Sequence, residues 1–166
     1  MYKYFIGIDP GKSGGISLIS NDGELIYKAP FDQTTKEYDP NILFGIFTQI
    51  NSIVGIGPVM AVIEKVSAMP GQGVSSMFKF GTMYGFIRMA VVAMGWSYEL
   101  IAPRTWTKEL HKGVDQNTQP KERSIIISSR LFPEQDFRKS QRSSTPHTGM
   151  VDATLLAYYG YLKHRG

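Results

Sequence analysis

The chain has 166 residues and a mass of 18.6 kDa, which fits a single domain of residues 1–166 large enough to bury a hydrophobic core. Hydrophobic residues make up 42% and charged residues 19%, a composition typical of a globular protein and not of a disordered one. The absence of cysteine excludes a disulfide framework and a thiolate zinc site. No apolar run approaches the roughly 18 residues of a membrane span, and the N-terminal residues lack a signal-peptide pattern. We therefore expect no membrane partner and a cytoplasmic, intracellular location.

The basic residues are concentrated in one part of the sequence. The formal net charge is +4, and the stretch from Pro103 to His147 holds nine basic and five acidic residues, a difference equal to that whole excess. Such a block is expected if one face of the protein meets phosphates. A solvated surface rich in lysine and arginine explains the charge equally well.

The first thirty residues predict three antiparallel strands. Short apolar runs cover Tyr4–Ile8 and Gly14–Ile19, and a third strand is expected over Glu24–Ala29. Between the second and third runs lies Asn21-Asp22-Gly23, a strong hairpin turn. The three strands therefore form a meander.

The rest of the chain alternates helices with two more strands. Apolar residues at helical spacing and a dense β-branched run distinguish the two kinds of element. The expected helices cover 40–54, 75–94, 105–111, 121–131 and 152–163, and the expected strands cover 59–66 and 98–101. This order implies an α/β fold with a mixed sheet.

Three acidic residues stand out from these elements. Asp9 follows an apolar strand, where a site is often built, although an Asp-Pro-Gly sequence is also an ordinary turn. Glu64 lies within the β-branched run Val59–Val66, where a buried acid is costly unless it is paired, and Lys65 points to the opposite face. Asp152 begins the last helix, where an acid is also favoured by the helix dipole alone.

Together the three acids predict a metal site. Carboxylates that converge repel one another unless a cation lies between them, and oxygen ligands without cysteine match Mg²⁺ or Mn²⁺. Such ions support phosphodiester hydrolysis. His147, five residues before Asp152, is either a further ligand or an exposed loop histidine.

Two other kinds of active site do not fit. Gly11-Lys12-Ser13 resembles the end of a nucleotide-binding P-loop, but that loop needs a glycine where this chain has Ile6. A serine hydrolase needs a Gly-x-Ser-x-Gly elbow, which is absent from the sequence. We therefore expect no nucleotide cofactor.

Several motifs in order resemble the RuvC-type Holliday junction resolvases of the RNase H-like superfamily, and in particular their phage and phage-like branch. The resemblance extends from about Tyr4 to Tyr161. It is carried by Ile6-Gly7-Ile8-Asp9-Pro10-Gly11 with Ser13-Gly14-Gly15, by Ile63-Glu64-Lys65-Val66, by Met69-Pro70-Gly71-Gln72-Gly73-Val74, and by His147-x-Gly149-x-x-Asp152-Ala153.

The resemblance implies both a fold and a reaction. The fold is RNase H-like: a five-stranded mixed sheet with the first three strands antiparallel, flanked by helices. The reaction is resolution of four-way DNA junctions by a homodimer that makes paired symmetric nicks and leaves 5′-phosphate and 3′-hydroxyl ends. Asp9, Glu64 and Asp152, with His147, would hold two Mg²⁺ or Mn²⁺ ions per active site. If the gene is carried by a phage, the location is the host cytoplasm.

The sequence departs from this family at Thr148, where relatives carry an aspartate four residues before the last acid. Residues four apart share a helix face, so two aspartates there would both reach the metals. Three readings remain: His147 replaces the ligand, one metal binds weakly, or cleavage is impaired. The alternative function is therefore a junction-binding protein that cuts poorly.

Contacts to DNA are expected from the basic block and from two residues outside it, Lys79 and Met69. Lys112 could stabilise charge at the cleaved phosphate, and Met69 could act as an apolar wedge at the junction centre. The residues predicted to bind nucleic acid are Lys79, Lys108, Lys112, Lys121, Arg123 and Met69.

Overall fold

A computed structural model describes residues 1–31, 39–67, 71 and 73–166 of the chain. Its five strands are β1 (Tyr4–Asp9), β2 (Gly15–Ser20), β3 (Leu25–Pro30), β4 (Val59–Glu64) and β5 (Ser97–Ile101). They form one sheet in the order β3-β2-β1-β4-β5. β1, β2 and β3 are antiparallel neighbours, whereas β1–β4 and β4–β5 are parallel pairs. The predicted mixed sheet with an antiparallel start is confirmed.

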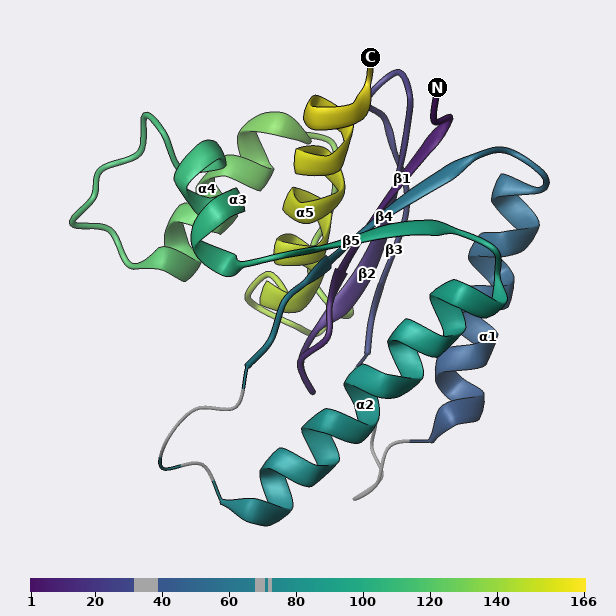
Figure 1. Cartoon of the computed structure of the whole chain (residues 1–166). Helices are drawn as coiled ribbons and strands as arrows, with labels where there is room; N and C mark the ends of the chain where they lie inside the picture. Colours follow the sequence, from purple (N-terminus) through teal and green to yellow (C-terminus); the bar gives the residue numbers. More distant parts are fainter. Residues whose placement is uncertain (32–38, 68–70, 72) are drawn as a thin grey trace.

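Helices cover both faces of this sheet. The helices are α1 (Pro40–Val54), α2 (Val74–Ala93), α3 (Pro103–Leu110), α4 (Pro120–Leu131) and α5 (Thr148–His164). Figure 1 shows α1 and α2 on one side of the sheet and α3, α4 and α5 on the other. None of the helices in the described ranges is long and apolar enough to cross a membrane.

The two faces of the central strands differ in what they carry. Side chains alternate along a strand, so Ile6 and Ile8 of β1 enter the core beneath α1 and α2. Gly7, which lies between them, and Asp9, which follows Ile8, face the opposite side, where Gly7 meets α5. β4 follows the same rule, because Ile63 joins the first core while Val62 packs with α5. Glu64, two residues after Val62, therefore faces the same side as Asp9.

Glycines let α5 lie directly on β1. A Cβ at Gly7 would lie 1.9 Å from the carbonyl oxygen of Ala153. A Cβ at Gly149 would lie 2.0 Å from the carbonyl oxygen of Ser13, in the β1–β2 turn. Both distances are far below a van der Waals contact, so only glycine allows this approach. The first turns of α5 are thereby held against the end of β1.

Most element boundaries differ from the sequence prediction by one or two residues, and two larger or more consequential differences bear on the acids. α5 begins at Thr148, four residues earlier than expected, because the His147 side chain caps it by accepting a hydrogen bond from the Met150 backbone N–H. The prediction that Asp152 begins the helix was therefore wrong, since Asp152 lies one turn inside it. β4 ends at Glu64 rather than Val66, and the glutamate is therefore the last residue of its strand.

Candidate active site

Two of the predicted acids end neighbouring parallel strands. Ile8 of β1 pairs with Ile63 of β4, so Asp9 and Glu64 are the next residues along that register. The carboxyl ends of the two strands meet at one edge of the sheet, which is where α/β proteins place their ligands. Both side chains are half-buried. The Asp9 Oδ1 also accepts a hydrogen bond from the Gly11 backbone N–H at 3.1 Å, which fixes the turn after β1.

The third acid reaches this edge from α5. Asp152 is half-buried, and the close packing of Gly149 against the β1–β2 turn brings its helix to the end of β1. Asp9 raises the pKa of Asp152, and both aspartates raise the pKa of Glu64. Each acid is therefore within electrostatic reach of another, so the structure brings the three predicted acids together.

Burial raises the pKa of all three acids, and repulsion from the other acids raises it further for Glu64 and Asp152. Desolvation is the largest cause in each case: it raises the pKa of Glu64 to about 7 and that of Asp152 to about 6, and it also raises the pKa of Asp9. The hydrogen bond from the Gly11 N–H and the positive charge of Lys121 act in the opposite direction on the pKa of Asp9. A cluster of partly desolvated carboxylates is a chemically suitable site for a hard divalent cation.

Two uncharged side chains hold two of the acids by hydrogen bonds. The indole Nε1–H of Trp106 donates to Glu64 Oε1 at 2.9 Å, and Trp106 is only 3% exposed. The hydroxyl of Ser124 bonds the Asp152 carboxylate and lowers its pKa. Neither residue was predicted from the sequence. Trp106 belongs to α3 and Ser124 to α4, and only the tertiary fold brings them to β4 and α5.

His147 lies near the acids, but its side chain caps the N-terminus of α5. Its Nδ1 accepts the Met150 N–H at 3.2 Å as the cap of α5. A neutral imidazole that accepts through Nδ1 carries its proton on Nε2. Binding a cation through Nε2 would require that proton to move and the cap to be lost. This geometry weighs against the reading that His147 replaces a missing ligand.

A basic pocket lies beside the acids, between α3 and α4. It has a volume of about 730 Å³, and no acidic residue is among those that line it. His111 and Pro120 form part of its wall, and Lys121, which follows Pro120, lowers the pKa of both Asp9 and Asp152. The basic side chains of this pocket, besides His111, are Arg104, Lys108, Lys112 and Arg123.

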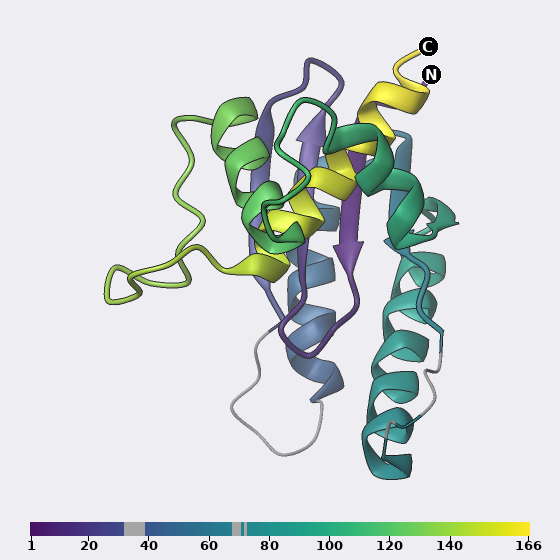
Figure 2. The same cartoon turned by 90° about the vertical axis from the view of Figure 1, so that its left-hand side faces the viewer.

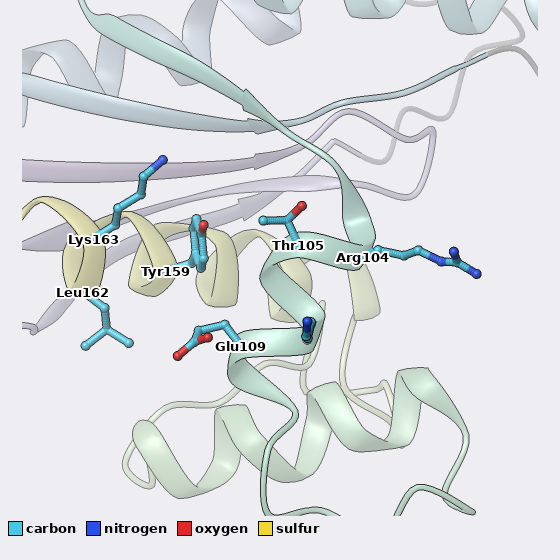
Figure 3. A pocket seen from close by; sticks show the side chains of 7 residues that line it. Arg104, Thr105, Glu109, Tyr159, Leu162 and Lys163 are labelled. Carbon is cyan, nitrogen blue, oxygen red and sulfur yellow. The ribbon is translucent and has the colours of Figure 1, made fainter.

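A second hollow of about 670 Å³ lies on the other side of α3, against α5. Figure 3 shows the side chains that line it, among them Tyr159, Leu162 and Lys163 from α5 and Arg104, Thr105 and Glu109 from α3. Glu109 and Leu162 make this hollow less basic than the basic pocket. The excess of basic over acidic side chains is therefore larger in the basic pocket between α3 and α4 than in this hollow.

The remaining residues that were predicted to bind DNA lie in several places. Lys112 lines the basic pocket and pairs with Glu109 at 2.9 Å, so its predicted role at the cleaved phosphate stays a prediction, and the lysine whose charge acts on the acids is Lys121. Lys79 is exposed on α2, in the opposite layer. Met69 lies outside the described residues.

The carboxylates do not form a finished metal site. Over residues 1–31, 39–67, 71 and 73–166, no three His, Asp or Glu side chains are arranged closely enough to hold an ion as they stand. Asp9, Glu64 and Asp152 still offer the right donor chemistry, because they are oxygen ligands whose repulsion a divalent cation would relieve. The donor set fits Mg²⁺ or Mn²⁺, with closure of the carboxylates around it.

The sheet order, the flanking helices and the acids at the end of β1 define an RNase H-like α/β fold. Within that class, solved structures similar to this chain are Holliday junction resolvases. RuvC from Thermus thermophilus in complex with a Holliday junction substrate has a TM-score of 0.66 at 13% identity, over 99% of this chain and 97% of that one. A second Thermus thermophilus RuvC structure has a TM-score of 0.63 at 16% identity, covering 96% and 95%.

A eukaryotic structure is also similar. The yeast mitochondrial Holliday junction resolvase Ydc2 has a TM-score of 0.58 at 12% identity, over 96% of this chain and 80% of that one. No protein-family model and no curated protein matches the sequence. The chain therefore has the fold of RuvC-type resolvases, as its motifs predicted.

The raised pKa values predict a stability that depends on pH. Glu64 has a pKa of about 7 in the fold against 4.5 when unperturbed, so the folded state keeps a proton that the unfolded state has lost. The stabilisation that comes from this bound proton is complete below about pH 4.5 and is lost as the pH rises through 7. In EDTA at pH 8, we expect Glu64→Gln to be more stable than the wild type and to melt at a higher temperature. The expected gain in the free energy of unfolding is about 1–2 kcal/mol, because Glu64 is partly in contact with solvent.

The comparison of Glu64→Gln with the wild type isolates this one group, since histidines titrate alike in both proteins. At pH 4.5 the two should melt at nearly the same temperature. Thermal unfolding followed by circular dichroism measures the difference. A Glu64→Gln variant less stable than the wild type at pH 8 would show that the carboxylate is satisfied without a cation.

Proposed function

We propose that the chain is a single-domain endonuclease that resolves four-way DNA junctions by divalent-metal-dependent phosphodiester hydrolysis, as a homodimer. The observation that carries this proposal is the electrostatic coupling of Asp9, Glu64 and Asp152 at one sheet edge, beside the basic pocket. The fold shared with RuvC and Ydc2 supports it. The predicted cytoplasmic location and the phage-like origin belong to the same proposal.

Each acid has a defined part in this mechanism. Asp9 and Glu64, on adjacent strands, and Asp152, from α5, would hold Mg²⁺ or Mn²⁺. When bound there, such cations make water a nucleophile for attack on phosphorus and stabilise the leaving 3′-oxygen. Lys121 places an ammonium near Asp9 and Asp152, where it would oppose the charge of a bound phosphate.

The basic pocket would hold the DNA backbone next to the cleaved bond. Lysine and arginine bind phosphates mainly by charge, so such a surface grips a strand without reading its sequence. Arg123 has the most suitable geometry, because its guanidinium is half-buried and directed by a 2.9 Å hydrogen bond from Nη1 to Gln116 Oε1. The pocket thus complements the proposed hydrolytic site.

Replacing Asp9 tests the proposed site directly. Asp9→Asn keeps the shape and the Gly11 hydrogen bond but removes a ligand charge, so we expect cleavage of a synthetic four-way junction in Mg²⁺ to fall by at least about a hundredfold. Binding of the junction in EDTA should remain within about threefold of the wild type, because the phosphate contacts are intact.

A surface acid supplies the matched control for this assay. Asp22 is exposed in the hairpin turn, and Asp22→Asn makes the same chemical change away from the site. The proposal is wrong if Asp9→Asn cuts at the wild-type rate. The metal preference follows from repeating the assay with Mn²⁺ and Ca²⁺.

The proposed dimer rests on α2, most of whose apolar side chains are uncovered. Only Met83, Ile87 and Val91 of this helix are buried in the core. Phe78 is 76% exposed and Met89 63% exposed. Large apolar side chains gathered in the open on one helix are typical of an interaction surface. Figure 2 shows α2 extending past the edge of the sheet, on the side where β1 ends.

A groove between α1 and α2 continues this surface. It has a volume of about 350 Å³ and is lined mainly by apolar side chains, including Phe44, Phe86 and Met89. Phe44 is itself 62% exposed. A second copy of the chain would cover this face with its own α2, as the two-fold symmetry of a dimer requires. It would leave the acids on the opposite layer free to bind DNA.

A charge placed on this face should separate the subunits. We expect Phe78→Glu to convert a dimer into a monomer at micromolar concentration, because the glutamate would be buried opposite another apolar surface. Sedimentation velocity measures the change. Ile56→Glu is the control, since Ile56 is fully exposed in the turn before β4 and outside the α2 face. A wild type that is monomeric at these concentrations would contradict the proposed dimer.

A second candidate, a junction-binding protein that cuts poorly, is favoured by Thr148. This residue is the first of α5, one helical turn before Asp152, and its neighbour His147 is engaged as the helix cap. The side chains that line this turn thus offer one carboxylate where the resembling family has two. The incomplete closure of the acids points the same way.

Restoring the carboxylate separates the two candidates. We expect Thr148→Asp to change the cleavage rate in Mn²⁺ by less than about tenfold, since three acids already supply a cation site. A larger gain, from a barely measurable wild-type rate, would favour the binding protein. Thr148→Asn is the matched control, because it has the same shape and no charge. The measurement is single-turnover cleavage of a labelled four-way junction.

A further inference from the structure

A buried hydrogen-bonded layer lies behind the acids, and it originates from one short helix. Trp106 of α3 donates to Glu64, as described above. His111, the C-cap of the same helix, is 5% exposed and lies 3.2 Å from the Ser124 hydroxyl through its Nε2. Ser124 in turn bonds Asp152. Two of the three acids are therefore held from α3, one directly and one through α4.

The direction of these hydrogen bonds follows from the groups involved. An ionised carboxylate only accepts, so the single proton of the Ser124 hydroxyl points to Asp152. The serine oxygen must then accept from His111, which carries its proton on Nε2. The chain of donors runs from His111 to Ser124 to Asp152. Trp106 and Ser124 thus donate to carboxylate oxygens, and His111 donates to the oxygen of Ser124.

The two branches are also rigid with respect to each other. The rings of Trp106 and His111 pack edge to face, with centroids 5.7 Å apart and planes at 87°. Trp106 and Ser124 are both at most 3% exposed, so neither has room to change rotamer. A displacement of one branch would therefore disturb the other.

We propose that Trp106 and His111 are positioning residues that fix the Glu64 and Asp152 carboxylates in the orientation that binds the divalent cation. The inference rests on the proposed nuclease function and adds the residues that prepare its site. Partners behind metal ligands orient them, and their loss commonly weakens metal binding by about 10–100-fold. Neither residue touches the cation in this role.

The chain offers a matched control for the tryptophan. Trp96, its other tryptophan, is 6% exposed and stacks on Phe47 in the core beneath α1 and α2. Within the described part of the chain, its Nε1 has no hydrogen-bond partner. Trp96→Phe thus removes a similar buried volume but no bond to an acid. The difference in Mn²⁺ affinity between Trp106→Phe and Trp96→Phe therefore reports the effect of the hydrogen bond to Glu64.

The test measures Mn²⁺ affinity of the full chain without DNA, from the free Mn²⁺ signal in electron paramagnetic resonance. We expect Trp106→Phe and His111→Leu each to raise the dissociation constant about tenfold, with Trp96→Phe within about twofold of the wild type. His111→Gln, which keeps an N–H donor for Ser124, should recover most of the loss. A purely structural role for His111 would not distinguish Gln from Leu.

An independent readout comes from the two indole N–H resonances of the wild type in NMR. Mg²⁺ should shift that of Trp106 and leave that of Trp96 in place, and Asp9→Asn should abolish the shift. Equal Mn²⁺ affinity in Trp106→Phe and the wild type would overturn the positioning role and leave the nuclease proposal standing. A wild type whose Mn²⁺ affinity does not depend on Asp9 would overturn both.

Discussion

The constraint on which the structure depends is the repulsion among three carboxylates that share a partly desolvated edge of the sheet. Burial, and to a lesser extent mutual charge, raises the pKa of Glu64 and Asp152 by more than the hydrogen bonds from Trp106 and Ser124 and the charge of Lys121 lower it. The fold brings them there all the same, because Gly7 and Gly149 allow α5 to lie directly on β1. Free energy from the two apolar cores is thus used to hold an arrangement that is unfavourable without a cation. Stability given up at one place in a fold is a common feature of functional sites.

The sheet separates the two tasks that the proposed function requires. One face carries the acids, the buried layer from α3 and the basic pocket, and the other carries the exposed apolar side of α2. The two are linked by a short path, since Glu64 ends β4 and the chain then passes through residues 65–73 to the start of α2. A partner that covers α2 would therefore lie one connection away from a proposed ligand.

The sequence predicted the parts of the site that depend on local pattern. An apolar run followed by an acid predicted a carboxylate at the end of its strand, and Asp9 follows this rule. Glu64 was predicted inside a strand that ran on to Val66, and the structure makes it the last residue of β4. The start of α5 was missed because histidine is not among the preferred N-cap residues, and only the structure shows its Nδ1 in that role. Trp106 and Ser124 could not be predicted, since no local pattern links α3 to β4 or α4 to α5. Lys121 was expected at DNA, but that its charge reaches the acids depends on the same tertiary packing.

The threonine at position 148 makes the buried layer more important for this chain than a fourth acid would. A site with another carboxylate would attract a divalent cation by charge alone, even if its ligands were loosely held. With Thr148 on that helix turn and with Lys121 nearby, the net negative charge of the site is smaller. Cation binding must then rely on orientation, because fixed ligands lose less conformational entropy when the ion arrives. The donors that Trp106 and Ser124 aim at their carboxylates supply that orientation. The neutral residue at 148 therefore reduces the attraction of the site for a cation, and the rigid hydrogen-bonded layer behind the acids compensates by orienting the remaining ligands.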